Sequence, residues 1–202
     1  EGIAGLAYNC QLMSIKTFDN TGNGTAADTA TAILWAVDHG ALVVNISAGD
    51  VFYSQAEQDA VDYAWEHGTL VVAAAGNEGD GANRTFYPAA CNGALGVGAT
   101  DMNDSTASYS NTGEYVGISA PGGDISYFPL GAWLIWTTMP TEDVPLKYLS
   151  YPDTGMYSYE TGTSMACPFV AGLAGLYASR FGITQGTVGG VLRMYQALQR
   201  GS

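Results

Sequence analysis

Positive charge is scarce in this chain. Its 202 residues include 6 Lys and Arg against 19 Asp and Glu, which gives a formal net charge of -13. A surface of that sign repels nucleic-acid phosphates and anionic lipids, so we expect neither a nucleic acid nor a membrane as partner. The acidic residues are dispersed, as Asp59, Asp62, Glu66, Asp101 and Asp104 show, which is typical of a solvated surface.

Cysteine and long apolar runs are also few. Cys10, Cys91 and Cys167 form an odd-numbered set. Their spacing fits neither a disulfide framework nor a zinc site, so we expect free, mostly buried thiols and no such metal centre. No apolar run is long enough to span a bilayer, and the N-terminus has neither an initiator Met nor the pattern of a signal peptide. We therefore expect the chain to begin within a longer protein.

What the chain does have is an apolar, glycine-rich composition, with 47% hydrophobic residues and 27 Gly. This predicts one globular domain over residues 1–202. A degenerate repeat runs through it: the segment 35–44 resembles the segment 64–72, each reading as a helix end, a glycine (Gly40 or Gly68) and an apolar strand. That order is typical of βαβ units around a buried parallel sheet, so the fold class is α/β.

The same periodicity predicts the individual elements. Thr25 followed by Asp28 is a helix-start pattern, which places the first helix at 25–39. Further helices are expected at 54–67, 164–181 and 187–199, and strands at 12–17, 42–47, 71–75, 95–100 and 115–119. The segment between Gly122 and Tyr159 predicts hairpins or an aromatic loop, with core packing and a partner surface both open as roles for Phe128, Trp133, Trp136, Tyr148, Tyr151 and Tyr157.

Two short segments carry candidate chemistry. Ser164 stands in Gly-Thr-Ser-Met-Ala before a helix rich in Ala and Gly. The helix start offers unpaired N–H groups that stabilise an oxyanion beside a serine nucleophile, although a serine there also serves simply as an N-cap. Asn77 follows an apolar strand and Gly76, so it lies at the carboxyl edge of the sheet, where it is either an oxyanion donor or a turn residue.

Together these segments resemble the subtilase family of serine proteases, and the resemblance runs along nearly the whole chain. The motifs that carry it are Ala73-Ala74-Ala75-Gly76-Asn77 and Gly162-Thr163-Ser164-Met165-Ala166, supported by the segments 5–16, 20–25, 44–49, 87–89, 97–99 and 119–122 in family order. The resemblance implies a three-layer α/β/α fold with a largely parallel sheet, cut short at its N-terminus. It also implies a serine-type endopeptidase that works through an acyl-enzyme, is secreted or at the cell surface, and acts on peptides or proteins.

The resemblance also assigns site residues. Ser164 is the expected nucleophile and Asn77, with the Ser164 backbone N–H, the expected oxyanion donor. Ser47, Ala48 and Gly49 would form one wall of the substrate cleft and Gly22 to Gly24 the opposing strand. Thr163 is expected in the substrate site. The primary side-chain pocket would be lined by Ala74, Ala75 and Gly76, with Glu78 near its floor and Tyr87 closing its far side.

The family pattern is broken where the catalytic aspartate and histidine should stand. Those motifs precede the segment with which this chain begins, and its 2 histidines, His39 and His67, are predicted helix ends at the amino edge of the sheet. A strand rises about 3.3 Å per residue, which places His67 roughly 20 Å or more from Asn77. We therefore expect the chain to be inactive alone. Cys167 and Phe169 also depart from the family, which should change core packing rather than chemistry.

Cofactors and partners complete the expectations. The resemblance implies no required cofactor. The family often binds calcium, however, and backbone carbonyls near Ala89, Cys91 and Ala94 form a possible weak calcium site. The surface exposed by the absent segment should recruit that segment as a separate chain or a second copy of this one. A peptide-binding module without activity stays an alternative. An α/β-hydrolase esterase is disfavoured, because Ser164 lies in Gly-x-Ser-x-Ala rather than Gly-x-Ser-x-Gly.

Overall fold

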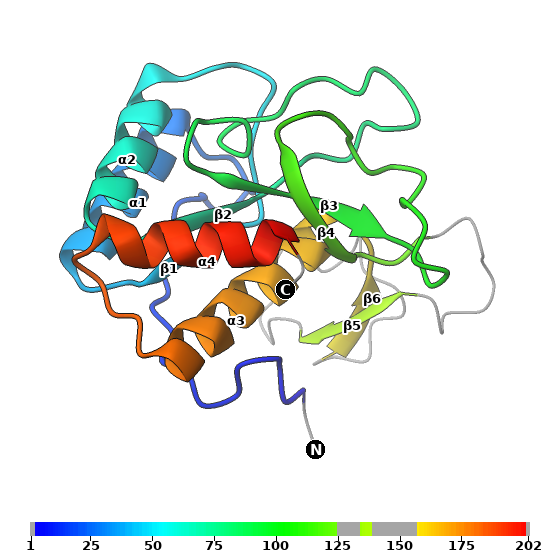
Figure 1. Cartoon of the computed structure of the whole chain (residues 1–202). Helices are drawn as coiled ribbons and strands as arrows, with labels where there is room; N and C mark the ends of the chain where they lie inside the picture. The colour runs from blue at the N-terminus through cyan, green and yellow to red at the C-terminus, as the bar shows by residue number, and fades with distance from the viewer. Residues whose placement is uncertain (1–2, 125–133, 139–156, 201–202) are drawn as a thin grey trace.

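The computed structural model describes residues 3–124, 134–138 and 157–200 (Figure 1). Its centre is a parallel sheet with strand order β1-β2-β3-β4, formed by Val43–Ile46, Leu70–Ala74, Leu95–Thr100 and Val116–Pro121. The register pairs Val43 with Leu70 and Val72 with Leu95, and it shifts between Gly96 and Val97 where β3 meets β4. The predicted parallel sheet is therefore confirmed.

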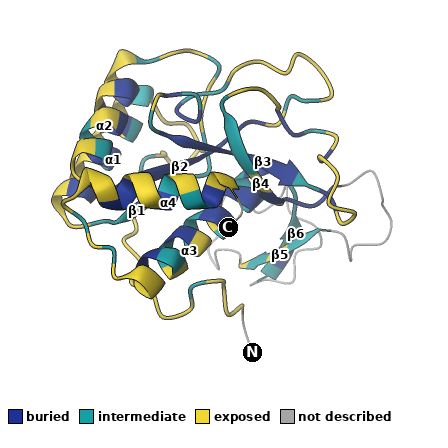
Figure 2. Ribbon diagram, in the orientation of Figure 1, coloured by how far each residue is buried: buried dark blue, intermediate teal, exposed yellow. Residues whose placement is uncertain are grey.

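Helices cover both faces of this sheet. Helices α1 (Ala26–Asp38) and α2 (Gln55–Glu66) pack together and bury one face, against Val71. Helices α3 (Thr163–Phe181) and α4 (Val188–Arg200) bury the other, against Leu70, Val72 and Leu95. Figure 2 shows the buried strands between helices whose outer faces are exposed. The alternation of β2 side chains toward two cores explains why the strand reads as continuously apolar.

The helix boundaries follow the local signals. Thr25 and Asp28 form the capping box of α1: the Asp28 N–H donates to Thr25 Oγ1 at 3.1 Å and the Thr25 N–H to Asp28 Oδ2 at 3.1 Å. Ser54 caps α2 through the Glu57 N–H. His39 and His67 are the C-cap residues of α1 and α2, as predicted. These short-range bonds satisfy N–H groups that a helix leaves without partners.

The predicted strand at 12–17 is wrong. Residues 11–17 belong to no strand or helix, and most of them are exposed. A strand needs a neighbour to accept its backbone hydrogen bonds, and within the described residues none pairs with this segment. Strand β1 is an edge strand of the described sheet, because it pairs with β2 on one side only. Its Asn45 is exposed.

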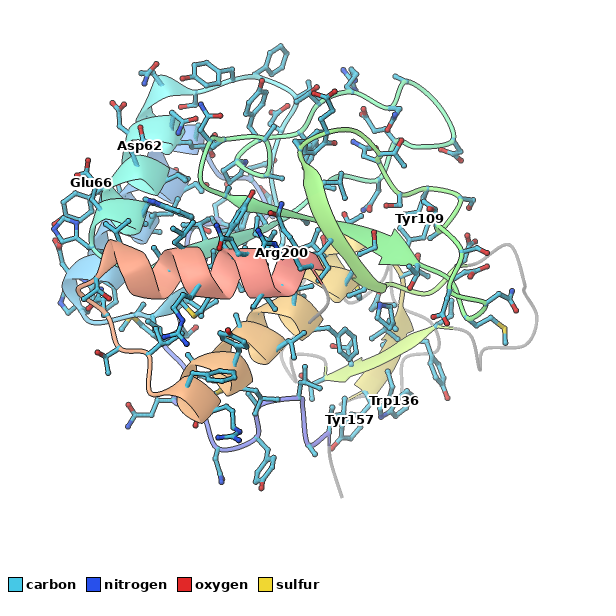
Figure 3. The ribbon with its side chains drawn as sticks, viewed as in Figure 1. Asp62, Glu66, Tyr109, Trp136, Tyr157 and Arg200 are labelled. Carbon is cyan, nitrogen blue, oxygen red and sulfur yellow. The ribbon has the colours of Figure 1, made fainter. Side chains whose placement is uncertain are left out.

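The aromatic segment contributes a two-stranded antiparallel sheet, in which β5 (Ile135–Thr138) pairs with β6 (Tyr157–Glu160). Trp136 stacks on Tyr157 with ring centroids 5.4 Å apart, and both are labelled in Figure 3. Antiparallel strands are thus present in the segment, while the residues that join them lie outside the described ranges. The predictions for Phe128, Trp133, Tyr148 and Tyr151 lie outside the described residues.

All three cysteines are free, with Cys91 and Cys167 buried and Cys10 exposed. The Cys167 Sγ lies 3.4 Å from the Val72 carbonyl and 3.7 Å from that of Ile46, so it fills the space between α3 and the sheet. Across the described ranges, no helix has the length and hydropathy needed to traverse a bilayer.

Candidate active site

Asn77 and Ser164 are brought together where β2 ends and α3 begins. The Asn77 Oδ1 accepts two hydrogen bonds from Thr163, one from its N–H at 2.9 Å and one from its hydroxyl at 2.8 Å. The Thr163 hydroxyl also accepts the Gly76 N–H at 3.2 Å. These bonds fix which end of the amide faces α3, because an amide oxygen that accepts two donors cannot exchange places with its nitrogen.

The amide nitrogen of Asn77 is directed to the helix start. A methyl group placed on Gly162, the residue before α3, would lie 3.3 Å from Asn77 Nδ2 and 3.6 Å from the Ser164 nitrogen. One region therefore lies close to both groups, and within the described residues neither N–H has a hydrogen-bond acceptor. Gly162, with a φ of 146°, leaves that region open. Two free donors around a common region can stabilise an oxyanion.

Ser164 is the second residue of α3, and the N-cap position belongs to Gly162. The alternative that Ser164 is merely an N-cap is therefore wrong. Its side chain is partly exposed, and its hydroxyl donates to the Ser47 carbonyl at 3.0 Å. In return, the Ser47 hydroxyl donates to the Ser164 carbonyl at 2.8 Å. That carbonyl lacks its usual partner in the helix because Pro168 has no N–H to donate.

The residues predicted to line the primary pocket and those predicted in the cleft wall differ in exposure. Ala74, Ala75 and Gly76 are buried, Ser47 and Ala48 are partly buried, and Gly49 is exposed. The Asp50 and Tyr87 backbones exchange hydrogen bonds of 2.9 and 2.7 Å, which ties the chain after Gly49 to Tyr87. The Tyr87 ring packs against Tyr53 and the core below α1 and α2, and the ring that contacts Gly49 and Gly76 is that of Phe86.

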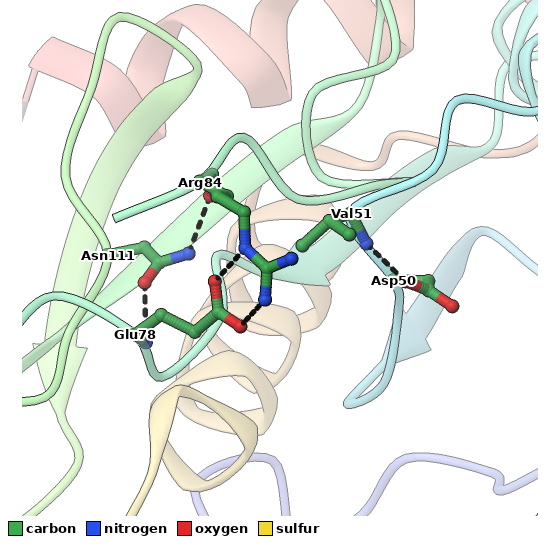
Figure 4. A network of polar contacts seen from close by, with 5 residues as sticks. All are labelled: Asp50, Val51, Glu78, Arg84 and Asn111. Carbon is green, nitrogen blue, oxygen red and sulfur yellow. Dashed lines mark hydrogen bonds and ion pairs between the residues drawn. The ribbon is translucent and has the colours of Figure 1, made fainter. Parts of the chain in front are cut away.

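Glu78 lies just beyond Asn77 and forms a bidentate ion pair with Arg84 (Figure 4). This hydrogen-bonded guanidinium lowers the pKa of the Glu78 carboxyl. Asn111 is 1% exposed and holds the two segments together: its Oδ1 accepts the Glu78 N–H at 2.6 Å and its Nδ2 donates to the Arg84 carbonyl at 2.8 Å. The predicted pocket-floor carboxylate is thus already neutralised within the chain.

The loop with Gly22 and Gly24 is organised by Asp19. The Asp19 carboxylate accepts the Thr21 N–H at 2.8 Å and the Asn23 N–H at 3.0 Å. A hollow of about 440 Å³ is lined by this loop and its flanks, namely Lys16, Thr17, Phe18, Asp19, Asn23, Gly24, Thr25 and Asp28. Neither Ser164 nor Asn77 lines it. In the described part of the chain, no hydrogen bond joins this loop to Ser47–Gly49, so its substrate role stays a prediction.

Three residues that sequence reasoning missed shape this region. They are Phe86 and Asn111, described above, and Tyr109, labelled in Figure 3. The Tyr109 hydroxyl accepts the Gly162 N–H at 2.9 Å and lies 2.7 Å from the Gly123 carbonyl, and burial raises its pKa to about 12. It positions the turn before α3. Asn111 in Asn-Thr-Gly reads only as a turn, and no local signal marks the other two.

The two histidines lie at the opposite edge of the sheet, as predicted. His39 and His67 end α1 and α2, and their Nδ1 atoms lie 2.7 Å from the Trp35 carbonyl and 2.8 Å from the Tyr63 carbonyl. Each also contacts the aromatic ring four residues earlier. Neither is a base for Ser164 in this arrangement, because both precede strands whose far ends carry the site.

The predicted calcium site finds no support in the donors. The Cys91 carbonyl accepts the Ala94 N–H at 3.1 Å. The described residues also hold no group of three or more His, Cys, Asp and Glu side chains suited to a metal. Calcium prefers several carboxylate and carbonyl oxygens arranged around it. Binding near Ala89, Cys91 and Ala94 therefore stays a prediction, and no step of the chemistry depends on it.

Comparison with known sequences gives a consistent result. The model of the subtilase family matches residues 1–194. The thermophilic serine proteinase of Bacillus sp. (strain AK1) is 41% identical over 179 residues, which cover 89% of this chain and 38% of that protein. Thermitase from Thermoactinomyces vulgaris is 40% identical, covering 89% of this chain and 55% of its own length. The chain thus spans roughly half or less of these relatives' length.

Solved structures show the same likeness. A protease from Pseudoalteromonas arctica superposes with a TM-score of 0.81 at 28% identity, over 98% of this chain and 58% of that one. A cold-adapted subtilisin-like serine proteinase gives a TM-score of 0.77 at 28% identity, over 98% of this chain and 63% of that one. With the family model matched over nearly all its residues, the chain belongs to the subtilase family.

Proposed function

We propose that this chain is the nucleophile-bearing part of a serine endopeptidase that cleaves peptides or proteins through an acyl-enzyme. Ser164 attacks the scissile carbonyl, and Asn77 Nδ2 and the Ser164 N–H stabilise the oxyanion that forms. One observation carries the proposal. The position that a Cβ atom on Gly162 would take is 3.3 Å from Asn77 Nδ2 and 3.6 Å from the Ser164 nitrogen, so one point lies close to both donors. A scaffold without chemistry has no need of two free donors beside a serine hydroxyl.

The general base is expected from outside the 202 residues. The Ser164 hydroxyl donates to the Ser47 carbonyl, which cannot accept its proton as a base does, and the two histidines lie at the other edge. A serine hydroxyl is a weak nucleophile without a base in hydrogen-bond reach. We therefore infer that the histidine and its aspartate come from a further segment of the full-length protein, and that the chain alone hydrolyses no peptide at a useful rate.

Labelling by a fluorophosphonate probe tests both statements. The 202-residue chain alone should label slowly or not at all, because the reaction needs the activated hydroxyl. The full-length gene product should label at Ser164 within minutes, and Ser164→Ala should abolish this labelling. Ser108→Ala is a matched control that should leave it unchanged.

Rapid stoichiometric labelling of the short chain would show that its base lies within these residues. A full-length product that neither labels nor hydrolyses any peptide would instead favour the second candidate, a peptide-binding module derived from this fold. That candidate rests on the absence of a nearby base among the described residues. Peptide binding without turnover would support it.

The proposal also includes the location and the partners of the protein. We propose that it is secreted or displayed at the cell surface and that its substrate is a peptide or protein. Its exposed apolar surface would be covered by a further segment of the protein or by a second copy of the chain. An extracellular protein would be found in the culture medium or accessible to a protease added to intact cells. Recovery of the full-length product only from the cell interior would overturn this part of the proposal and leave the chemistry untouched.

A further inference from the structure

The ring of Phe86 lies between Gly49, predicted in one wall of the substrate cleft, and Gly76, predicted to line the primary pocket. A Cβ atom added to Gly49 would lie 2.8 Å from Phe86 Cε1, and one added to Gly76 would lie 2.9 Å from Phe86 Cγ. Carbon atoms in ordinary contact stand about 3.5–4.0 Å apart. The ring therefore lies against both glycines, together with the Tyr87 carbonyl oxygen at Gly49 and Asn111 Nδ2 at Gly76, which are the atoms nearest to the added carbons.

The backbone around Phe86 is held on both sides. The Tyr87 backbone exchanges two hydrogen bonds with Asp50, directly after the Gly49 wall. Asn111 Nδ2 donates to the Arg84 carbonyl (Figure 4). The Asn111 N–H donates to the Gly76 carbonyl at 3.0 Å. The segment that carries Phe86 is thus attached beside both glycines, so the ring leaves the space between them only by rotating about its own side-chain bonds.

The carboxylate predicted near the floor of this pocket, that of Glu78, is charge-balanced. Glu78 is occupied by both nitrogens of the Arg84 fork, a geometry that matches a carboxylate better than the single ammonium of a lysine does. A basic substrate side chain would have to displace Arg84 to pair with Glu78. The site therefore lacks the free charge that a basic substrate residue needs.

We propose that Phe86 is a specificity-determining residue that closes the primary pocket, so that cleavage follows residues with small side chains: Gly, Ala or Ser. The inference rests on the proposed peptidase function and names its substrate class. A small side chain rests against the Phe86 ring without moving it. A larger one gains apolar contact only after displacing the ring from Gly49 and Gly76, which reduces the net benefit of binding.

A series of peptides that differ only in the residue on the acyl side of the scissile bond tests the proposal on the full-length protein. With Ala, Leu, Phe and Lys at that position, kcat/KM should be highest for Ala. Phe86→Ala should raise kcat/KM for Leu and Phe on the order of 10–100-fold and change that for Ala by a few-fold at most. Phe52→Ala, which removes a ring that is 76% exposed, should preserve the wild-type order.

The outcomes separate this inference from the proposed function. A wild-type preference for Leu or Phe over Ala, or an unchanged order in Phe86→Ala, overturns the role of Phe86, whereas fluorophosphonate labelling of Ser164 still supports the peptidase. If Phe86→Ala fails to fold, Phe86→Leu should shift the order in the same direction. If the protein hydrolyses nothing, calorimetry with peptides ending in Ala or Phe decides: tighter binding of the Phe peptide to the wild type contradicts a closed pocket.

Discussion

At the residue scale, the function proposed for Asn77 depends on one amide group held by Thr163. Asn77→Ala removes the Nδ2 donor, and in the full-length protein kcat should fall on the order of 10²–10³-fold with little change in KM, the loss known for a subtilisin. Steady-state kinetics checks this. Asn92→Ala, on an exposed residue remote from Ser164, is the matched control. A larger effect on KM than on kcat would indicate a substrate-binding role instead.

Glu57 is a second residue whose chemistry is open to measurement. It is 5% exposed, and its carboxylate has no hydrogen-bond partner within the described residues. Burial, with the negative charge of Asp50 as a smaller cause, raises its pKa from 4.5 to about 7. The groups that share its electrostatic surroundings are Asp50 and the buried Cys91, whose pKa is itself raised to about 12.

A raised pKa in the folded state means that folding favours the protonated carboxyl. The stability it contributes is fully present below pH 4.5 and is lost as pH rises through about 7. Glu57→Gln should therefore be relatively more stable than wild type at pH 8 than at pH 5, by on the order of 2 kcal/mol in the free energy of unfolding. Urea titrations at both pH values measure this, with the exposed Glu66→Gln on the same helix as control. Equal differences at both pH values would contradict the expectation.

At the element scale, the start of α1 depends on the capping box of Thr25 and Asp28. Thr25→Ala removes the oxygen that accepts the Asp28 N–H and the hydroxyl that donates to Asp28 Oδ2 at 2.6 Å. The full-length protein should lose about 1 kcal/mol of unfolding free energy, measured by chemical denaturation. Thr31→Ala, within the same helix and also exposed, should have a much smaller effect. Equal losses for both substitutions would show that capping is not the cause.

At the scale of the whole molecule, apolar surface and a strand edge stay uncovered within the described residues. Leu12 is 91% exposed and Tyr8 is 76% exposed, and β1 pairs on one side only. Edges and patches of this kind favour association. We predict that the 202-residue chain alone forms dimers or larger species at tens of micromolar, as measured by light scattering.

A charged substitution at this surface tests which part of it mediates association. Leu12→Asp should lower the apparent mass, whereas Phe52→Asp, which replaces a side chain that is 76% exposed on another loop, should not. A monodisperse monomer at every concentration would contradict the prediction. So would equal loss of association in both variants, because the effect would then reflect added charge rather than the surface around Leu12.

Local sequence by itself determined the helices and most strands of this protein. Some features depend on only a few neighbouring residues, so the sequence alone predicts them. They are the helix caps at Thr25 and Ser54, the helix ends at His39 and His67, and the apolar run of β2. The motif around Ser164 likewise marked the helix start and the nucleophile candidate. The prediction of a strand at 12–17 was wrong because a strand needs a partner strand from elsewhere in the chain, and a local sequence pattern does not show whether one is present.

Only the tertiary structure decided how the site is assembled. Ser47 reaches Ser164 across 117 positions, Thr163 reaches Asn77 across 86, and Asn111 reaches Glu78 across 33. These bonds depend on the positions of β1, β2 and α3 in space, so the periodicity of the sequence does not predict them. The position of the Phe86 ring between Gly49 and Gly76 is of the same kind, because it depends on contacts made after the chain has folded.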